Sequence, residues 1–512
     1  MVGGKDGHLH VDGKVSASVV WRSESGGAAA VKKASRQPVA NVSPRLSPPG
    51  GPPRSTKPSF RAALTVFEYR HYRYLWVSSA FSFTGMQMQQ IARALLAWEL
   101  TKSFGAVGAI SLSFGLPMML FSLIGGSLAD RLDKRNLTLM TQVSTAILAT
   151  FTAVLVATDT ITIEMLFAIG LVQGTFFAFG MPARTPLMAE VVGPDNVMSA
   201  IAMSNAAMNA TRLFGPAVAG VLVAIWGIEA AYFVQGALYV LSAAILLRVP
   251  SGLSAVARMG RPQPDGNMFV EVGRGLKYAA TTPKLRLLIG MLFIVTFFAM
   301  PYIVLLPGFV QEDLGKSQGA FGLLQSFSGA GALVGSLAMA SLTAYDRKPL
   351  VQWVAGVAGG GGLLLLAFAS GPFGYVGAVG AIVVLGLAFT AYQTLNNTML
   401  MDEADPAYYG RVMSINMLTF SAMPMMSYPL GLIADALGAR GTFVLEGSIV
   451  LAFMALVAVA NRGYTFGRQE ECPAVTEFEG IGARPAAGMP VGMGPEDAGQ
   501  AEARPAGFRG RA

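Results

Sequence analysis

The residues in this sequence that are best suited to chemistry are charged and amide side chains that interrupt long apolar runs. The densest charged group follows Gly126 and contains Asp130, Arg131, Lys134 and Arg135, with an apolar run on either side. Two spans joined by so short a loop form an antiparallel hairpin, and small residues allow another helix to approach closely. Short loops rich in arginine and lysine stay on the cytoplasmic side of a membrane. The group therefore predicts a cytoplasmic loop whose charges set the topology of the chain.

Three ionisable residues lie within the apolar runs themselves. Arg212 lies well inside the fifth run, Arg93 in the outer part of the first and Glu446 near the outer end of the last. A charge at membrane depth is unfavourable unless it faces a cavity or a partner. Both arginines are candidates for an anionic substrate group or an ion pair, although Arg93 could instead extend to the outer interface. No acid lies unmistakably at the midplane, so no proton-coupling residue is evident, and either Glu446 or the acids at the span boundaries could serve.

Amide side chains mark the same runs. An amide facing lipid would lose its hydrogen bonds, so these side chains are expected to point into the protein. Gln87 and Gln90 share one helical face near the middle of the first run. The further candidates for substrate contacts are Gln173, Asn205, Asn209, Gln325 and Asn416. The alternative for each is a hydrogen bond that joins two helices.

The elements that must position these residues are membrane-spanning helices. Hydrophobic residues make up 53% of the chain, charged residues 13%, and the mean hydropathy is +0.52. A soluble domain needs about 25% charged residues to cover its surface. The runs are too long and too continuously apolar for barrel strands, so the predicted fold class is an all-α membrane protein. The net charge of +8 reflects the cytoplasmic bias of basic residues and does not indicate nucleic-acid binding.

Hydropathy predicts about twelve spans, arranged as two six-helix bundles. They lie near 75–98, 105–129, 137–157, 163–183, 198–226, 229–248, 285–309, 319–342, 350–369, 373–397, 410–433 and 441–461. The predicted domains are a disordered tail at 1–58, an N-terminal bundle at 59–248, a linker at 249–283, a C-terminal bundle at 284–461 and a disordered tail at 462–512. The basic loops, including one at Arg184, put the linker and both tails in the cytoplasm.

An internal repeat supports the division into two halves. The sequence Gly-Ser-Leu-Ala that begins at Gly126 returns at Gly335, and a Val-Met-Ser sequence near 198 returns near 413. Paired halves of this kind are typical of transporters, with a substrate site at their interface.

Over about residues 60–465 the chain resembles the major facilitator superfamily. The loop motif of that family, Gly-x-x-x-Asp-Arg/Lys-x-Gly-Arg/Lys-Arg/Lys, matches Gly126 to Arg135, except that Asp133 replaces the preferred glycine. A second family motif, Gly-Pro-x-x-Gly-Gly, is associated with exporters and matches Gly215, Pro216 and Gly220, with an alanine for one glycine. The segments 87–93 and 410–414 are similar to the branch of the enterobactin exporter and transmembrane secretion effectors.

The resemblance implies a mechanism. Asp130 would hold the two bundles closed on the cytoplasmic side, at the start of the eleventh span, where a helix dipole favours a carboxylate by about 0.3–1 kcal/mol. The exporter-type motif would bend the fifth span and seal the bundle interface. The expected activity is export of a small amphiphilic molecule, siderophore- or drug-like, across the inner membrane by alternating access, coupled to proton influx.

Three alternatives remain open at this point. An uncoupled facilitator fits the lack of a midplane acid, and a lysolipid flippase fits the methionines of the eleventh span. A scaffold or sensor without transport is disfavoured by the buried amides and Arg212. No enzyme motif, phosphate-binding glycine loop or metal-ligand cluster occurs, so no cofactor is expected. The expected partners are the substrate, protons and membrane lipids, with no nucleic acid, and the chain is expected to be monomeric.

Overall fold

The computed structural model describes residues 64–193, 196–252, 273, 277–341, 347–405 and 408–462. Within these ranges, the side chains of 122–131, 340–341, 410–411, 414, 417, 420 and 421 are not described. The predicted tails at 1–58 and 462–512 and most of the predicted linker therefore lie outside the described residues, apart from Arg462. All regular elements in the described ranges are helices.

The first half of the chain forms long helices from its continuous apolar runs. After a short 3-10 turn, η1 (Thr65–Glu68), come α2 (Arg70–Thr101), α3 (Phe104–Arg131), α4 (Lys134–Ala157), α5 (Ile163–Val192) and α6 (Val197–Leu246). Gly227 interrupts α6 with a φ of +88°, a conformation that favours glycine, so α6 consists of two helices joined at a sharp turn.

The second half repeats this pattern. Its helices are α9 (Pro283–Phe298), α10 (Tyr302–Gly308), the π-helical turn η3 (Phe309–Asp313), α11 (Gln318–Ser341), α12 (Lys348–Ala369), α13 (Gly374–Glu403) and α14 (Tyr409–Ala460). Gly438 divides α14 as Gly227 divides α6, with a φ of +75°. The predicted span at 285–309 is interrupted before Tyr302, where Pro301 lacks a backbone donor.

Among the described residues, nine helical segments are long and apolar enough to cross a membrane. Two of these, α6 and α14, each contain a glycine break, and α2 is not among the nine. The low hydropathy of α2 follows from its three glutamines and its arginines. The all-helical membrane fold is thus confirmed, whereas the number of twelve spans and the bundle bounds stay predictions.

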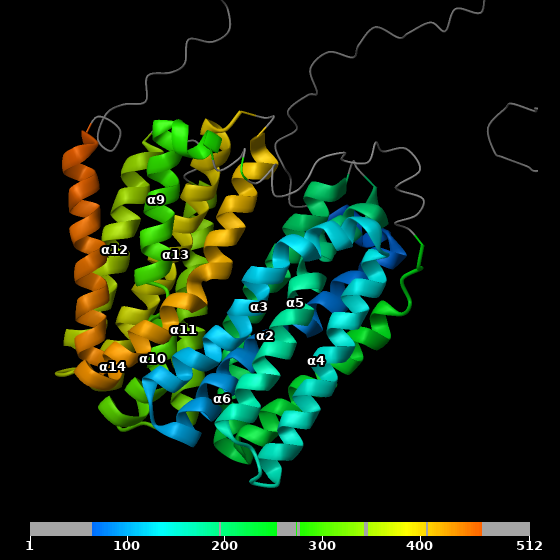
Figure 1. Ribbon diagram of the computed structural model, residues 1–512, viewed down its shortest axis with the longest axis horizontal. Coiled ribbons are helices and arrows are strands. Elements are labelled where there is room, and N and C mark those ends of the chain that lie inside the picture. The colour runs from blue at the N-terminus through cyan, green and yellow to red at the C-terminus, as the bar shows by residue number, and fades with distance from the viewer. Residues whose placement is uncertain are drawn as a thin grey trace, which may run out of the picture. The chain divides into compact units, whose positions relative to one another are not determined.

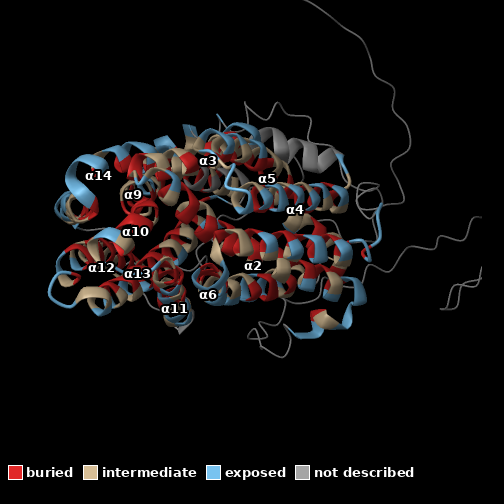
Figure 2. Cartoon of the chain, turned by 90° about the horizontal axis from the view of Figure 1, so that it is seen from below, coloured by how far each residue is buried: buried red, intermediate tan, exposed pale blue. Residues whose placement is uncertain are grey.

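The helices α2–α6 and α9–α14 form two sets that lie side by side (Figure 1). The most extensive contacts between the sets join α3 with α14 and α6 with α11, and α10 also touches α2 and α3. Buried residues gather inside each set and exposed residues on its outer surface (Figure 2). We call the end where α10 and the breaks at Gly227 and Gly438 lie the outer end, and the opposite end, with the α3–α4 loop, the inner end.

One predicted loop is in fact helical. Helix α5 continues to Val192, so Arg184 lies inside a helix and not in the cytoplasmic loop that the sequence suggested. Its Nη2 donates a hydrogen bond to Ser82 Oγ at 2.9 Å, and its guanidinium lies 5.0 Å from the centre of the Phe83 ring. The helix includes Pro182 and Pro186, which neighbouring helices in a membrane bundle can accommodate.

Candidate functional site

The charged loop is anchored to its own half of the protein. Lys134 Nζ lies 2.5 Å from Glu190 Oε1 at the end of α5, and the two side chains are only 10% and 7% exposed. Arg135 Nη2 donates to the carbonyl oxygen of Leu247 at 3.0 Å, just after α6. These contacts join the loop to the inner ends of α5 and α6.

The other members of the motif are Gly126, Asp130 and Arg131. They lie in the last turns of α3, where side chains are not described. The predicted gate between Asp130 and the start of the eleventh span therefore lies outside the described side chains and stays a prediction.

Asp133 has a clear role at the position where the related family prefers glycine. Its Oδ1 accepts a hydrogen bond from the backbone N–H of Asn136 at 3.1 Å, which caps the N-terminus of α4. Its Oδ2 accepts from the backbone N–H of Gly252 at 2.6 Å. The aspartate thus starts α4 and ties the loop to the chain that follows α6.

The exporter-type motif lies where α6 packs against two other helices. A Cβ atom on Gly215 would lie 2.7 Å from Cβ of Gln87 on α2. A Cβ on Gly220 would lie 2.9 Å from Cα of Gly322 on α11, and one on Gly322 would lie 2.5 Å from the carbonyl oxygen of Pro216. Only glycine allows these approaches, so the motif brings α6 against α2 within one half and against α11 across the halves.

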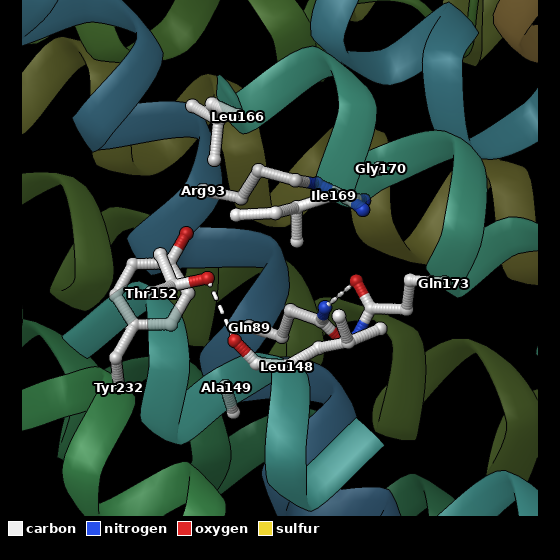
Figure 3. A pocket seen from close by; sticks show the side chains of 10 residues that line it. All are labelled: Gln89, Arg93, Leu148, Ala149, Thr152, Leu166, Ile169, Gly170, Gln173 and Tyr232. Carbon is white, nitrogen blue, oxygen red and sulfur yellow. Dashed lines mark hydrogen bonds between the residues drawn. The ribbon is translucent and has the colours of Figure 1, made fainter. Parts of the chain in front are cut away.

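Arg93 turns inward and does not extend along the helix to the outer interface. Its guanidinium carbon lies 4.6 Å from the centre of the Phe114 ring on α3. Its Nη1 is buried and has no hydrogen-bond partner among the described residues. The side chain lines a small cavity together with Gln89, Gln173 and Tyr232 (Figure 3).

Arg212 and Glu446 belong to different halves, and both lie near the same tyrosine. Arg212 is half-buried on α6, and Glu446 on α14 is fully buried, with no hydrogen-bond partner for either carboxyl oxygen among the described residues. Both lie close enough to Tyr302 on α10 for their charges to be felt at its hydroxyl. A buried ionisable residue without a partner is a functional candidate in a membrane protein.

The amide candidates divide into two groups. Gln173 accepts a hydrogen bond from Gln89, and Asn416 Nδ2 donates to Asn397 Oδ1 at 2.7 Å, so both join helices within one half. The other amides remain candidates for substrate contact. Gln325 is buried, and its Oε1 is unpaired among the described residues. Gln87 and Asn209 are half-buried, and Gln90 and Asn205 are exposed.

The sequence did not single out Gln89, which pairs with Gln173. The i, i+3 spacing of Gln87 and Gln90 drew attention to one face of α2, whereas Gln89 lies on the face toward α5. A signal was available, because three glutamines within four positions of a helix must point in different directions.

Two carboxylates at the outer end accept hydrogen bonds from the opposite half. The sequence did not select either of them as a site residue. Asp435 Oδ1 accepts from the backbone N–H of Phe104 at 2.6 Å, and its Oδ2 accepts from Gly105 N–H at 3.0 Å and Ser103 Oγ at 2.8 Å. Asp435 of α14 thus binds the N-terminus of α3. No sequence pattern pointed to Asp435, because its partners lie more than three hundred residues away.

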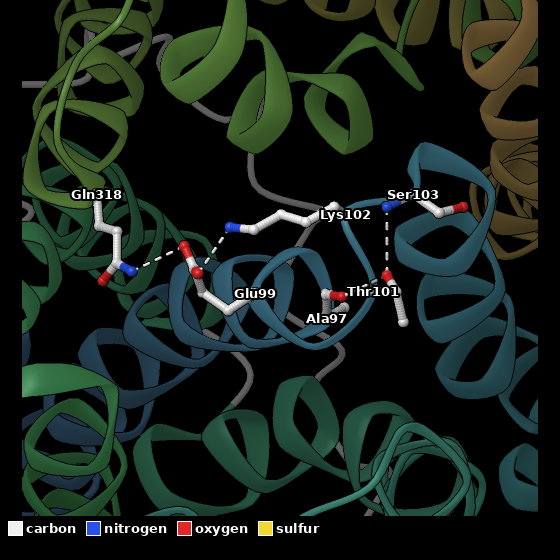
Figure 4. Close-up of polar contacts among 6 residues, drawn as sticks. All are labelled: Ala97, Glu99, Thr101, Lys102, Ser103 and Gln318. Carbon is white, nitrogen blue, oxygen red and sulfur yellow. Dashed lines mark hydrogen bonds and ion pairs between the residues drawn. The ribbon is translucent and has the colours of Figure 1, made fainter.

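Glu99 forms the second contact between the two halves. Its Oε1 accepts from Gln318 Nε2 of α11 at 2.8 Å, and its Oε2 lies 2.7 Å from Lys102 Nζ (Figure 4). Burial would raise the pKa of Glu99, but the hydrogen bonds from Lys102 and Gln318 outweigh burial and hold the pKa below its usual value.

Comparisons with known proteins agree with this architecture. Residues 61–472 match the family described as transmembrane secretion effector. The staphyloferrin A transporter of Staphylococcus aureus is 24% identical, with 76% of this chain and 96% of that protein covered. Macrolide efflux protein A of Streptococcus pyogenes is 22% identical, with 76% and 95% covered. The enterobactin exporter EntS of Shigella flexneri is also 22% identical, with 67% and 79% covered.

Solved structures share the fold at low identity. A bacterial homolog of the human lysosomal transporter Spinster, in an inward-facing and unoccupied conformation, superimposes with a TM-score of 0.61 at 14% identity, covering 81% of this chain and 100% of that one. The nucleoside transporter NupG superimposes with a TM-score of 0.60 at 17% identity, covering 77% and 99%. The chain therefore belongs to the transmembrane secretion effector family of the major facilitator superfamily, and it is a multi-pass membrane transporter and not an enzyme.

Proposed function

We propose that the chain exports a small amphiphilic organic molecule, siderophore- or drug-like, across the inner membrane, coupled to proton influx. Relatives that carry staphyloferrin A, macrolides and enterobactin support this substrate class. The observation that carries the proposal is the position of the contacts between the halves: Asp435 and Glu99 both join them at the outer end. A transporter closed at its outer end is in the state in which an exporter takes up its substrate from the inner side.

Alternating access follows from the nature of these contacts. The N-terminus of α3 carries unpaired N–H donors and a partial positive charge, and Asp435 supplies the matching carboxylate from the other half. Such a contact re-forms easily because it depends on one side chain. At the inner end, Lys134 pairs with Glu190 and Lys348 with Asp402, each pair within one half. The halves thus have internal bonds that persist while the outer contacts open.

Proton coupling is assigned to Glu446 and contact with an anionic group of the substrate to Arg212. Both lie near Tyr302 on α10, a helix of the second half that also contacts α2 and α3 of the first. When Glu446 loses its proton, its negative charge attracts Arg212 of the opposite half. A proton on Glu446 removes this attraction, so proton binding on one half changes how strongly the halves hold together.

The test uses purified protein in liposomes with an imposed pH gradient. Efflux of amphiphilic dyes and of a catecholate siderophore is measured with and without a protonophore. We expect gradient-dependent transport that is lost in Glu446→Gln and Arg212→Ala, and retained in Glu164→Gln, whose side chain is exposed at the start of α5.

Two results would contradict the coupled exporter. Transport that ignores the protonophore would favour the uncoupled facilitator, and transport of lysolipid in place of the dyes would favour the flippase. Transport that stays coupled to the pH gradient in Glu446→Gln would show that Glu446 does not carry the coupling proton.

A further inference from the structure

The cavity beside Arg93 lies inside the N-terminal half, away from the contacts between halves. Side chains from α2, α4, α5 and α6 line it, including Gln89, Thr152, Gln173 and Tyr232 (Figure 3). About 10 Å³ of it is open to the centre of a water-sized sphere, so the cavity holds one water molecule with some room around it. Any ligand in it must therefore be water-sized or slightly larger.

The free hydrogen-bonding groups at this cavity are a guanidinium donor and a hydroxyl that can donate or accept. Arg93 Nη1 is buried without an acceptor among the described residues, and the hydroxyl of Tyr232, a residue only 3% exposed, also lacks a partner there. Two acceptors nearby are already in use: Gln173 accepts from Gln89, and the carbonyl oxygen of Leu148 accepts from Thr152. A ligand between these groups must accept hydrogen bonds, which excludes a cation.

The charge of Arg93 decides between water and an anion. The group that interacts electrostatically with Arg93 is Tyr232, and within the described part of the chain no carboxylate does so. The ring of Phe114 contributes a cation–π contact of about 0.5–2 kcal/mol, which does not neutralise a full charge. Arg93 is half-buried with its Nη1 fully buried, and a cation in such a position without a counter-charge is unfavourable. Water would satisfy the hydrogen-bond donors but would not neutralise the charge of Arg93.

We propose that this cavity binds a single-atom anion of the size of chloride, held by Arg93 and Tyr232. The anion neutralises Arg93 and, through these two residues, joins α2 to the second helix of α6. The site is separate from the substrate path proposed above and does not depend on it.

The experiment measures thermal unfolding of the purified full-length protein in detergent at constant ionic strength. Chloride and bromide are compared with gluconate and sulfate, which are too large for the cavity. We expect the halides to raise the unfolding temperature in a saturable way, with an apparent dissociation constant that rises at least about tenfold in Arg93→Gln because a charge-assisted hydrogen bond is lost. Arg184→Gln is the matched control, since Arg184 lies on α5 in the same half with Ser82 as its partner, and it should keep the halide effect.

Two further measurements keep the proposal testable if Arg93→Gln does not fold. Tyr232→Phe removes one hydroxyl and should weaken halide binding without abolishing it. Crystals grown in bromide should show an anomalous peak beside Arg93 Nη1. The absence of both a halide-specific shift and a bromide peak would overturn the proposal in favour of water. Stabilisation by formate or acetate but not by halides would also overturn it, in favour of a carboxylate group of the substrate.

Discussion

The outer and inner ends of the two halves are stabilised in different ways. At the outer end, Asp435 and Glu99 accept hydrogen bonds from the opposite half. At the inner end, Lys134 and Glu190 form a nearly dry ion pair inside one half. Under the alternating access proposed above, a contact between halves opens in each cycle, whereas a contact within a half persists.

The free energies expected for the two kinds of contact differ in the same sense. Hydrogen bonds to a charged group contribute about 1.5–3 kcal/mol each, which a bound substrate or proton can offset. Removing one partner of a buried ion pair costs about 3–5 kcal/mol, because the other charge is left uncompensated. The comparison therefore predicts that variants at the inner pair unfold the protein, and variants at the outer contacts change its conformation.

The largest effect is expected at the inner pair. Glu190→Ala leaves Lys134 buried without this partner and should lower the free energy of unfolding by about 3–5 kcal/mol. The measurement is denaturant unfolding in detergent. The double variant Lys134→Met/Glu190→Leu should regain most of the loss, since it buries no charge. A double variant as unstable as the single one would contradict the role of the pair.

The next effect concerns the packing of α6 on α11. In Gly322→Val, the new side chain would meet the backbone of Pro216 and Gly220, which cannot move aside. Transport should fall at least about tenfold, because the cost of overpacking is about 1–3 kcal/mol. Gly380→Ala on α13 is the control, because nothing lies within 4 Å of a Cβ there. Equal transport in both variants would show that the contact is not required.

The smallest effect concerns pH. Because the pKa of Glu99 is lowered in the folded protein, its contribution to stability is present above the unfolded pKa, about 4.3, and is lost as pH falls through the lowered value. The difference in unfolding temperature between wild type and Glu99→Gln should therefore stay constant from about pH 5 to 8 and shrink below about pH 4. A difference that changes near neutral pH would mean that Glu99 titrates there.

Much of the fold could be predicted from the sequence, because hydropathy over long runs is a local property. The approximate positions of the spans and of the α3–α4 loop follow from it, whereas the exporter-type motif came from the resemblance to a known family. The end of α5 could not be predicted, since Pro182 and Pro186 stop a helix in water but not inside a bundle.

The partners of the polar residues were harder to predict. Neighbouring helical residues point about 100° apart, so Gln87, Gln89 and Gln90 contact different surroundings although they are nearly adjacent in sequence. Which face meets which helix depends on contacts far along the chain. For the same reason the pairing of Asp435 with the N-terminus of α3, more than three hundred residues away, leaves no local pattern.

The central claim is that Asp435 holds the outer end closed, and spin-label distances test it most directly. One label pair at Glu164 and Leu437 reports the outer end, and one at Leu132 and Arg347 reports the inner end. In Asp435→Asn, which removes the charge from the N-terminus of α3, we predict longer outer distances and shorter inner distances than in wild type. Distances that stay unchanged at both ends would contradict the account.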